Sequence, residues 1–421
     1  MLDIKFIRQN PDIVKEGCRK KQVKVDIDKL LELDKGAREI RAQIDKLRAG
    51  HKDTSTQMAS SVATEEKATI KIKGREEKEK IRKLEKKLKE IKKEINSLLL
   101  QIPNPPLDDV PFGKDEKENV VIKEWGQKTK FDFQPKDYLE IAENLDLIDI
   151  KRAAKVSGTR FGFLKGEAAL LEFALVNLAF DTLIPEGFIP VIPPVMIKPE
   201  MMKGMGYLER GGEEMYFIEK DSLYLIGTAE QIIGPMHVGE IFEEKELPKR
   251  YVGFSSCFRR EAGAYGRDTR GIFRVHQFDK AEMFSFCHPE KSKKEHLFFL
   301  EMEEKLMQKL AIPYRVVQMC TGDLGDPAAA KYDVEAWVPS ERRFRETHST
   351  SNCTDFQARR LNIRYRDKKT KRLEFVHTIN GTALAIGRTL IAIIENYQQK
   401  DGGIKIPKVL QKYLKFRLIK K

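Results

Sequence analysis

The stretch CFRREAGAYGRDTRGIFRVHQFDKAEMF, residues 257–284, decides the fold of the larger, C-terminal part of the chain. Its middle, AGAYGRDTRG (262–271), is rich in glycine and basic residues, and runs that suit β-strands lie on either side. Glycine supplies the backbone conformations that a tight reversal requires. The stretch therefore predicts two antiparallel strands joined by a mobile loop.

Both predicted strands carry candidate ligand-binding side chains two residues apart. Arg259 and Glu261 should point to one face, as should Phe278, Lys280 and Glu282 on the return strand, because side chains alternate along a strand. A guanidinium can hold a phosphate oxygen, and an aromatic ring can stack on a base. The faces together predict a nucleotide-binding platform. For any single pair, a salt bridge between exposed strands is the alternative.

From about residue 120 onward the chain contains further short β-rich runs, with an amphipathic helix predicted near residues 167–180. These runs do not alternate regularly with helices, as a doubly wound parallel sheet requires. The pattern favours the α+β class, with a mainly antiparallel sheet flanked by helices. The predicted strands include IPVIPPVMI (189–197), SLYLIGT (222–228), RYVGFSSCF (250–258) and RRFRETHSTSN (342–352).

The N-terminal part of the chain is predicted to be helical. Two short helices are expected within residues 1–25, the second opening at Asn10-Pro11, where Asn can cap a helix and Pro suits its first turn. Two heptad stripes then predict long helices, and the polar HKDTSTQMASSVATEE (51–66) between them predicts a turn or frayed tip of an antiparallel coiled-coil arm over about 27–100. The stripes consist of Leu33, Ala37, Ile40, Ile44 and Leu47, and of Ile81, Leu84, Leu88, Ile91, Ile95 and Leu98.

The second predicted helix is strongly basic. Between Lys71 and Glu94 it has twelve Lys or Arg residues against six Glu, and the whole chain has a formal net charge of +13. Such charge favours a polyanionic partner such as RNA, with a solvated or dimerising coil as the alternative for this segment.

Prolines separate the arm from the rest of the chain. In QIPNPPLDDVPFG (101–113) four prolines fall within nine residues, which forbids a helix. We therefore expect a domain of residues 1–104, a linker over 105–120, and a second domain over 121–421.

Composition also bears on metals and location. The five cysteines are scattered, without a CxxC pair, which favours reduced thiols and argues against structural zinc. The N-terminal MLDIKFIRQNPDIV lacks the pattern of a secretory signal, and no run of about 18 apolar residues is expected. We expect a cytoplasmic protein without a membrane span.

Several motifs together carry a family resemblance. Phe258, Arg259, Glu261, Arg274, Phe278 and Glu282 match motif 2 of the class II aminoacyl-tRNA synthetases. TINGTALAIGRTL (378–390) resembles motif 3, and GFIPVIPP (187–194) resembles motif 1, the dimer motif of the class. GRDTRG, IGTAEQ (226–231) and RETHSTSNCTDFQARR (345–360) resemble the bacterial-type seryl-tRNA synthetases in particular.

The resemblance implies roles for individual residues. Arg259, Glu261 and Arg388 would be catalytic, and Glu346 and Ser349 would hold Mg²⁺. Serine would be bound by Thr228, Ala229, Glu230, Arg259, Glu282, Asn380 and Thr382. ATP would be bound by Arg259, Arg260 (through its backbone), Glu261, Val275, Phe278, Glu346, Thr347, His348, Ser349 and Arg388.

The implied activity is that of a serine–tRNA ligase. It would use ATP to convert L-serine to seryl-adenylate and then transfer serine to the 3′ end of tRNA(Ser), with tRNA(Sec) as a further candidate acceptor. The arm would bind the tRNA, and a homodimer is expected. A ligase that loads a carrier protein, or an inactive RNA-binding paralogue, are the alternatives; the basic arm speaks against the first and the intact motif residues against the second.

Overall fold

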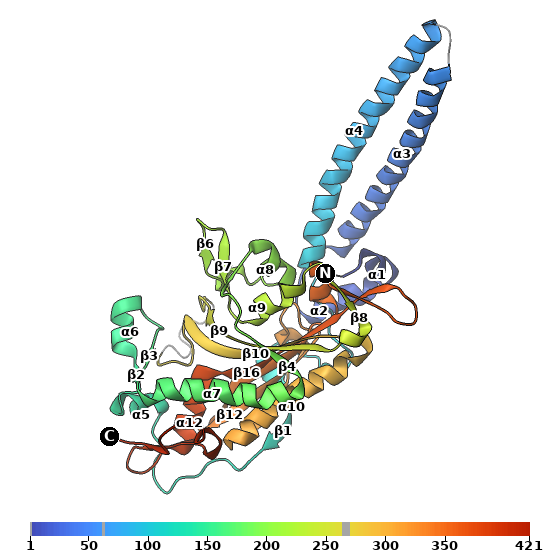
Figure 1. Cartoon of the computed structure of the whole chain (residues 1–421). Coiled ribbons are helices and arrows are strands. Elements are labelled where there is room, and N and C mark those ends of the chain that lie inside the picture. Colours follow the sequence, from blue (N-terminus) through green and yellow to red (C-terminus); the bar gives the residue numbers. More distant parts are fainter. Residues whose placement is uncertain (1, 61–63, 263–269) are drawn as a thin grey trace. The chain divides into compact units, whose positions relative to one another are not determined.

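The computed structural model describes residues 2–60, 64–262 and 270–421. The chain divides into two compact units, Leu2–Pro103 and Asn104–Lys421 (Figure 1). Each unit has its own secondary structure, and each is described by itself below.

The N-terminal unit is built from helices, as predicted. Helices α1 (Ile4–Gln9) and α2 (Pro11–Lys20) come first, followed by the long α3 (Ile27–Ser60) and α4 (Thr64–Gln101). Pro11 begins α2, but the side chain of Asn10 does not cap it: its Nδ2 donates instead to the carbonyl oxygen of Phe6, at 3.1 Å. The predicted side-chain cap is therefore wrong, because Asn10 closes the preceding helix.

Helices α3 and α4 pack against each other as an antiparallel hairpin. All the predicted seam residues are buried or half-buried, and ion pairs join Lys29 to Glu94 at 2.5 Å and Arg48 to Glu85 at 2.7 Å. Helix α3 continues to Ser60 and α4 begins at Thr64, so much of the segment 51–66, where a turn or frayed tip is predicted, is helical. The polar residues 51–60 and 64–66 are compatible with helix, and 61–63 lie outside the described residues.

The C-terminal unit is centred on an eight-stranded sheet, in which all neighbours are antiparallel except β4 and β9. This confirms the predicted α+β class. The order of its strands is β1 (Val120–Trp125), β11 (Tyr314–Gln318), β12 (Ala330–Val338), β13 (Arg343–Asn352), β16 (His377–Ala385), β10 (Gln277–Cys287), β9 (Lys249–Phe258) and β4 (Phe188–Val191).

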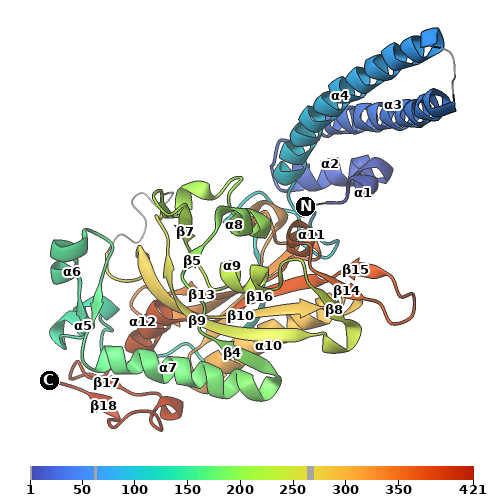
Figure 2. The ribbon, with the colours of Figure 1, turned by 45° about the horizontal axis from the view of Figure 1, so that its top comes forward.

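Helices cover both faces of this sheet (Figure 2). Alternate residues of β10 show the division: Ala281 and Met283 join the large core with α7 (Glu167–Leu183), α10 (Ser292–Leu310) and α12 (Ile386–Tyr397). Phe284 and Phe286 join a second core with α8 (Pro199–Met205), α9 (Glu230–Ile233) and α11 (Phe356–Leu361).

Short elements complete the unit. They are α5 (Tyr138–Asn144), α6 (Ile150–Ser157), β2 (Ile148–Asp149), β3 (Phe163–Leu164), β5 (Met196–Ile197), β6 (Phe217–Ile218), β7 (Leu223–Leu225), β8 (Ile241–Glu243), β14 (Arg364–Arg366), β15 (Leu373–Phe375), β17 (Ile404–Lys405) and β18 (Leu418–Ile419).

Helix α7 is more apolar than predicted. Within the described residues, the segment Glu167–Glu186 is long and apolar enough to cross a membrane by length and composition alone, and half of its most apolar window is buried inside the unit. The expectation that no such run exists is therefore wrong. Its buried side chains, Leu171, Leu175 and Leu178 among them, belong to the core of the sheet.

The proline-rich segment is fixed to the C-terminal unit at its start. The side chain of Asn104 is buried, and its Nδ2 donates to the carbonyl oxygens of Pro327 and Cys353, both at 2.8 Å. Further along, Leu107 and Val110 pack in a small apolar cluster with Val317 of β11 and with residues 319–330 that follow it. The prolines prevent a helix, and the docked side chains hold the segment in place.

Candidate active site

A cavity of about 620 Å³ opens in the C-terminal unit, lined by residues of β10, β12, β13 and β16 and of the loops beside them. Glu230 of α9 also lines it, so it lies on the face of the sheet that carries α8, α9 and α11. The register explains the lining: Thr347, Ser349 and Ser351 alternate along β13 and point to one face.

Most of the predicted site residues are brought together around this cavity, although they come from five separate stretches of the chain. They are Thr228, Glu230, Arg259, Glu261, Val275, Phe278, Glu282, Glu346, Thr347, Ser349, Asn380, Thr382 and Arg388.

The structure does not place Ala229, Arg260 or His348 at the cavity. Ala229 is fully buried beside Ile233, where it fills the second core. Arg260 is exposed, and its backbone N–H donates to the carbonyl oxygen of Glu214 at 2.9 Å. His348 is buried on the other face of β13, because neighbouring strand residues alternate, and burial lowers its pKa to about 4. The side chains of Ala229 and His348 thus do not line the cavity, and a contact through the backbone of Arg260 stays a prediction.

At one end of the cavity, the buried carboxylate of Glu230 gathers several donors. Its Oε1 accepts hydrogen bonds from the Tyr207 hydroxyl at 2.9 Å, Asn380 Nδ2 at 2.9 Å and Gln357 Nε2 at 3.1 Å. Burial, together with the negative charge of Glu282, raises the pKa of Glu230 to about 7. This end therefore has an acidic character that suits a small cationic ligand.

A second buried carboxylate, Glu282, stands beside it on β10. It is 2% exposed and forms an ion pair with Lys280. Lys280 Nζ also lies 3.5 Å from the hydroxyl of Thr382 on the neighbouring β16. Carboxylates, an amide and a hydroxyl thus surround a space in which a small polar molecule can be held.

The residues of motif 2 form the next part of the site. β9 ends at Phe258, so Arg259 and Glu261 follow the strand instead of lying on it, and Glu261 has a left-handed backbone with φ of 50°. Arg259 donates from Nε to the carbonyl oxygen of Gly227 at 3.2 Å, and its guanidinium lies over the ring of Phe278 at 5.3 Å. Glu261 pairs with Arg274 at 3.3 Å. The turn directs both side chains into the cavity, which strand alternation alone does not account for.

The opposite end of the cavity contains a strong cation–anion pair. Arg388 Nη1 lies 3.1 Å from Glu346 Oε1 and donates to the Glu346 carbonyl oxygen at 3.2 Å. Enclosure in the protein would raise the pKa of Glu346, but the positive charges of Arg388, Lys331 and Arg259 outweigh it and lower the pKa to about 2. Glu346 is thus ionised, and its side chain keeps 42% exposure toward the cavity.

Sequence reasoning missed four residues of the site: Tyr207, Gln357, Phe273 and Lys331. Tyr207 and Gln357 hold Glu230, and the ring of Phe273 stacks under the guanidinium of Arg388 at 4.8 Å. Lys331 lines the cavity from β12. FQARR (356–360) contains Gln357 within the quoted motif, but nothing local marks the others, because only the sheet brings their strands and loops together.

Only some of the residues that line the cavity could bind a divalent cation. Among the residues that the structure describes, no group of three or more His, Cys, Asp or Glu side chains is arranged around one point. Glu346 and Ser349 nevertheless offer oxygen donors, and Glu346 is ionised, which fits a hard cation that takes its remaining ligands from phosphate and water.

Comparison with known proteins agrees with this geometry. Residues 1–106 match the model of the seryl-tRNA synthetase N-terminal domain, and residues 216–397 match that of the tRNA synthetase class II core domain (G, H, P, S and T). A serine–tRNA ligase of Dictyoglomus turgidum is 50% identical over 98% of both chains.

Solved structures resemble the chain over its whole length. Seryl-tRNA synthetase from Pyrococcus horikoshii, complexed with ATP, has a TM-score of 0.93 and 42% identity, covering 100% of this chain and 99% of its own. The cytoplasmic serine–tRNA ligase of Naegleria fowleri in complex with AMP has a TM-score of 0.89 and 35% identity, with the same coverage. On the strength of these matches, the chain belongs to the seryl-tRNA synthetase family.

Proposed function

We infer that the chain is a serine–tRNA ligase, which activates L-serine with ATP and transfers it to tRNA(Ser), with tRNA(Sec) as a further candidate acceptor. One observation carries this: a single cavity combines an acidic end around Glu230 and Glu282 with a cationic part around Arg259 and Arg388. The first suits the ammonium and hydroxyl of serine, and the second suits polyphosphate.

In the first step, a serine carboxylate oxygen attacks the α-phosphorus of ATP in line. A new O–P bond forms, the bond to pyrophosphate breaks, and seryl-adenylate remains. The protein contributes by holding the reactants together and by placing positive charge where negative charge spreads. Arg259 would bridge the serine carboxylate and the α-phosphate, and Arg388 would face the γ-phosphate. Glu261 would hold Arg274 in place through their ion pair, on the side of the site where adenine would bind.

Adenine would stack on the aromatic part of the site. Phe278 lines the cavity and has the guanidinium of Arg259 over its ring. Val275, which also lines it, gives an apolar contact, and Thr347 a polar one. A base on Phe278 would have Arg388 on its far side, which is a common arrangement for purine recognition.

Glu346 and Ser349 would hold Mg²⁺, which would neutralise phosphate charge when bound with ATP. Arg388 forms an ion pair with the carboxylate of Glu346. Phosphate would draw the guanidinium away and leave the Glu346 oxygens facing the cavity.

Selection of serine would rest on polar groups that an alanine side chain leaves unsatisfied. Glu230 and Glu282 would bind the ammonium and the hydroxyl, with Thr228, Asn380 and Thr382 completing the pocket. Such a site rejects an analogue that lacks the hydroxyl by roughly 10⁴-fold.

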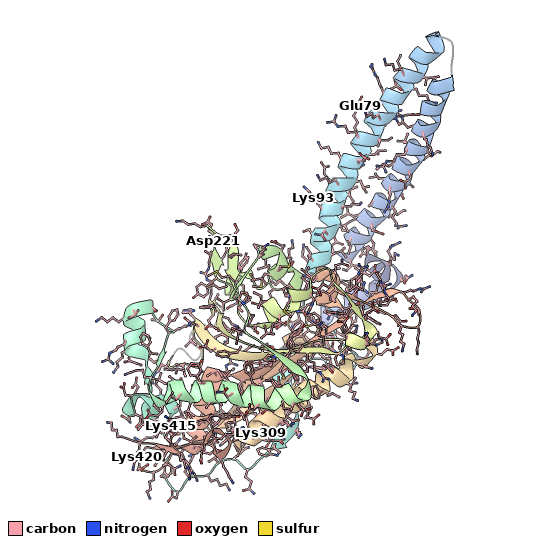
Figure 3. All side chains as sticks on the ribbon, viewed as in Figure 1. Glu79, Lys93, Asp221, Lys309, Lys415 and Lys420 are labelled. Atoms are coloured by element: carbon pink, nitrogen blue, oxygen red, sulfur yellow. The ribbon has the colours of Figure 1, made fainter. Side chains whose placement is uncertain are left out.

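The second step transfers the seryl group. The terminal ribose hydroxyl of the tRNA attacks the acyl carbon, and AMP leaves. The N-terminal domain, residues 1–104, would bind the tRNA by its arm, with 105–120 as the linker and 121–421 as the catalytic core. Exposed side chains stand out along α4, with Lys93 among them (Figure 3), and a basic helix suits the phosphates of double-stranded RNA.

We also propose a homodimer formed through motif 1. Large apolar side chains in and beside this motif are exposed in the single chain, including Phe173 at 63% and Ile192 at 72%. The proposed interface also includes the exposed Leu170, Ile184 and Ile189, which are apolar side chains of the kind that subunit interfaces cover. The five cysteines are buried, which is in keeping with reduced thiols in the cytoplasm.

The test is ATP–pyrophosphate exchange with each of the twenty amino acids in turn. Exchange that depends on serine alone supports the proposal. Exchange with another amino acid would contradict the serine pocket, and no exchange at all would favour the inactive paralogue.

A further inference from the structure

Lys331 is a lysine in the cavity to which the motifs give no role. It belongs to β12, opposite Ser351 on β13, and both side chains line the cavity. Its side chain is 23% exposed. A lysine is seldom enclosed to this extent unless a partner or a function holds it there.

The surroundings of Lys331 keep it charged. Its Nζ lies 3.2 Å from Oδ1 of Asp333, two residues further along the same strand and on the same face. Burial by itself lowers the pKa of Lys331, but Asp333, Glu346 and Asp323 outweigh it, so the pKa is raised. The ammonium is thus a fixed positive charge.

One carboxylate leaves much of this ammonium available. An ammonium has three donor hydrogens, and the ion pair with Asp333 involves a single carboxylate oxygen, Oδ1. The remaining donors belong to a side chain that lines the same cavity as Arg259 and Arg388. Lysine is a common phosphate ligand because it is a compact charge with several donors.

We propose that Lys331 is a phosphate-binding residue of this active site, held in position by Asp333. The proposal rests on the proposed function, and it adds a cation on β12 to those of motifs 2 and 3. The phosphate has two sources in that reaction: the polyphosphate of ATP or pyrophosphate, and the backbone at the 3′ end of the tRNA.

Three variants of the full chain test this: Lys331→Met, Lys331→Arg and Lys293→Met. Lys293 is the matched control, because it pairs with Asp109 at 2.5 Å but lies outside the cavity with 70% of its side chain exposed. KM values for ATP, pyrophosphate and serine are measured by exchange and the KM for tRNA by charging, with thermal unfolding as a check on folding.

The expected result is that Lys331→Met raises the KM for ATP and pyrophosphate about 10-fold or more, with the KM for serine unchanged. If the phosphate is that of tRNA, the KM for tRNA rises instead and exchange is unaffected. In either case Lys331→Arg restores most of the affinity and Lys293→Met resembles the unmodified chain.

The proposal is overturned if Lys331→Met leaves all of these KM values unchanged. It is also overturned if all of them change together with a lowered unfolding temperature, because the lysine would then serve only the fold. An unmodified chain without serine-dependent exchange would instead refute the proposed function, so the two failures are distinguishable.

Discussion

Glu230 is the residue through which pH should act on serine binding. Its raised pKa of about 7 means that it becomes protonated as the pH falls below 7. A protonated Glu230 attracts the serine ammonium less, so the KM for serine should rise by up to about tenfold per pH unit below 7 and level off above it.

Measurement of the KM for serine between pH 6 and 8 checks this. Glu230→Gln should have weaker binding without that pH dependence, whereas the KM for ATP should follow the same course in both proteins. A KM for serine that is level across this range in the unmodified chain would rule out Glu230 as the titrating group.

Arg259 should not be replaceable by lysine. Its planar guanidinium both donates to Gly227 and lies over Phe278, and an ammonium cannot do both while holding two anionic groups. We expect Arg259→Lys to lower kcat/KM for exchange by about 100-fold or more. Its unfolding temperature should be close to that of the unmodified chain, and exchange kinetics near the unmodified level would contradict the bridging role.

At single residues, the sequence motifs predict most of the side chains that line the cavity, but not which neighbours on a strand face away from it. The alternation of β13 separates Thr347, which lines the cavity, from His348, which lies in the core. A register shift next to Glu346 keeps that side chain in the site as well. Such irregularities depend on the partner strand, so a single sequence cannot show them.

At the scale of elements, the outer face of α4 should contribute to tRNA binding by charge. Lys86, Lys89, Lys92 and Lys93 are exposed on this helix. Their replacement by glutamine should raise the KM for tRNA about tenfold or more and reduce its dependence on salt, because fewer counterions are released on binding. ATP–pyrophosphate exchange should be unaffected.

The matched control replaces Lys309, Lys408, Lys415 and Lys420, which belong to the C-terminal unit, by glutamine. This variant has the same net charge as the α4 variant. Equal losses in both would show that overall charge, and not the arm, governs tRNA binding.

Apolar periodicity predicts some of the helices and strands correctly and others not. The heptad stripes and the antiparallel sheet were predictable because apolar spacing reports which face is buried. The helix over residues 51–60 is not evident from periodicity, because a polar segment can be a helix as well as a loop. Helix α7 is more apolar than an amphipathic helix should be. One of its faces packs in the core, and apolar side chains such as Leu170 and Phe173 are exposed as well.

At the scale of the whole molecule, the apolar surface of motif 1 should hold two copies together. Phe173→Asp combined with Ile192→Asp would place charges where the interface is proposed, so the double variant should sediment as a monomer. Val156→Asp is the control, because Val156 is equally exposed at 72% but lies on α6, outside the motif. A double variant that still sediments as a dimer would place the interface elsewhere.

In the whole molecule, we propose that both units serve the loading of serine onto its tRNA. The most direct test is to charge total tRNA with labelled serine, using the full chain with ATP and Mg²⁺, and to identify the labelled tRNAs. We expect the label to be confined to serine-accepting tRNAs, tRNA(Ser) above all. Serine-dependent exchange without labelled tRNA would contradict it and would point to a ligase that uses a different acceptor.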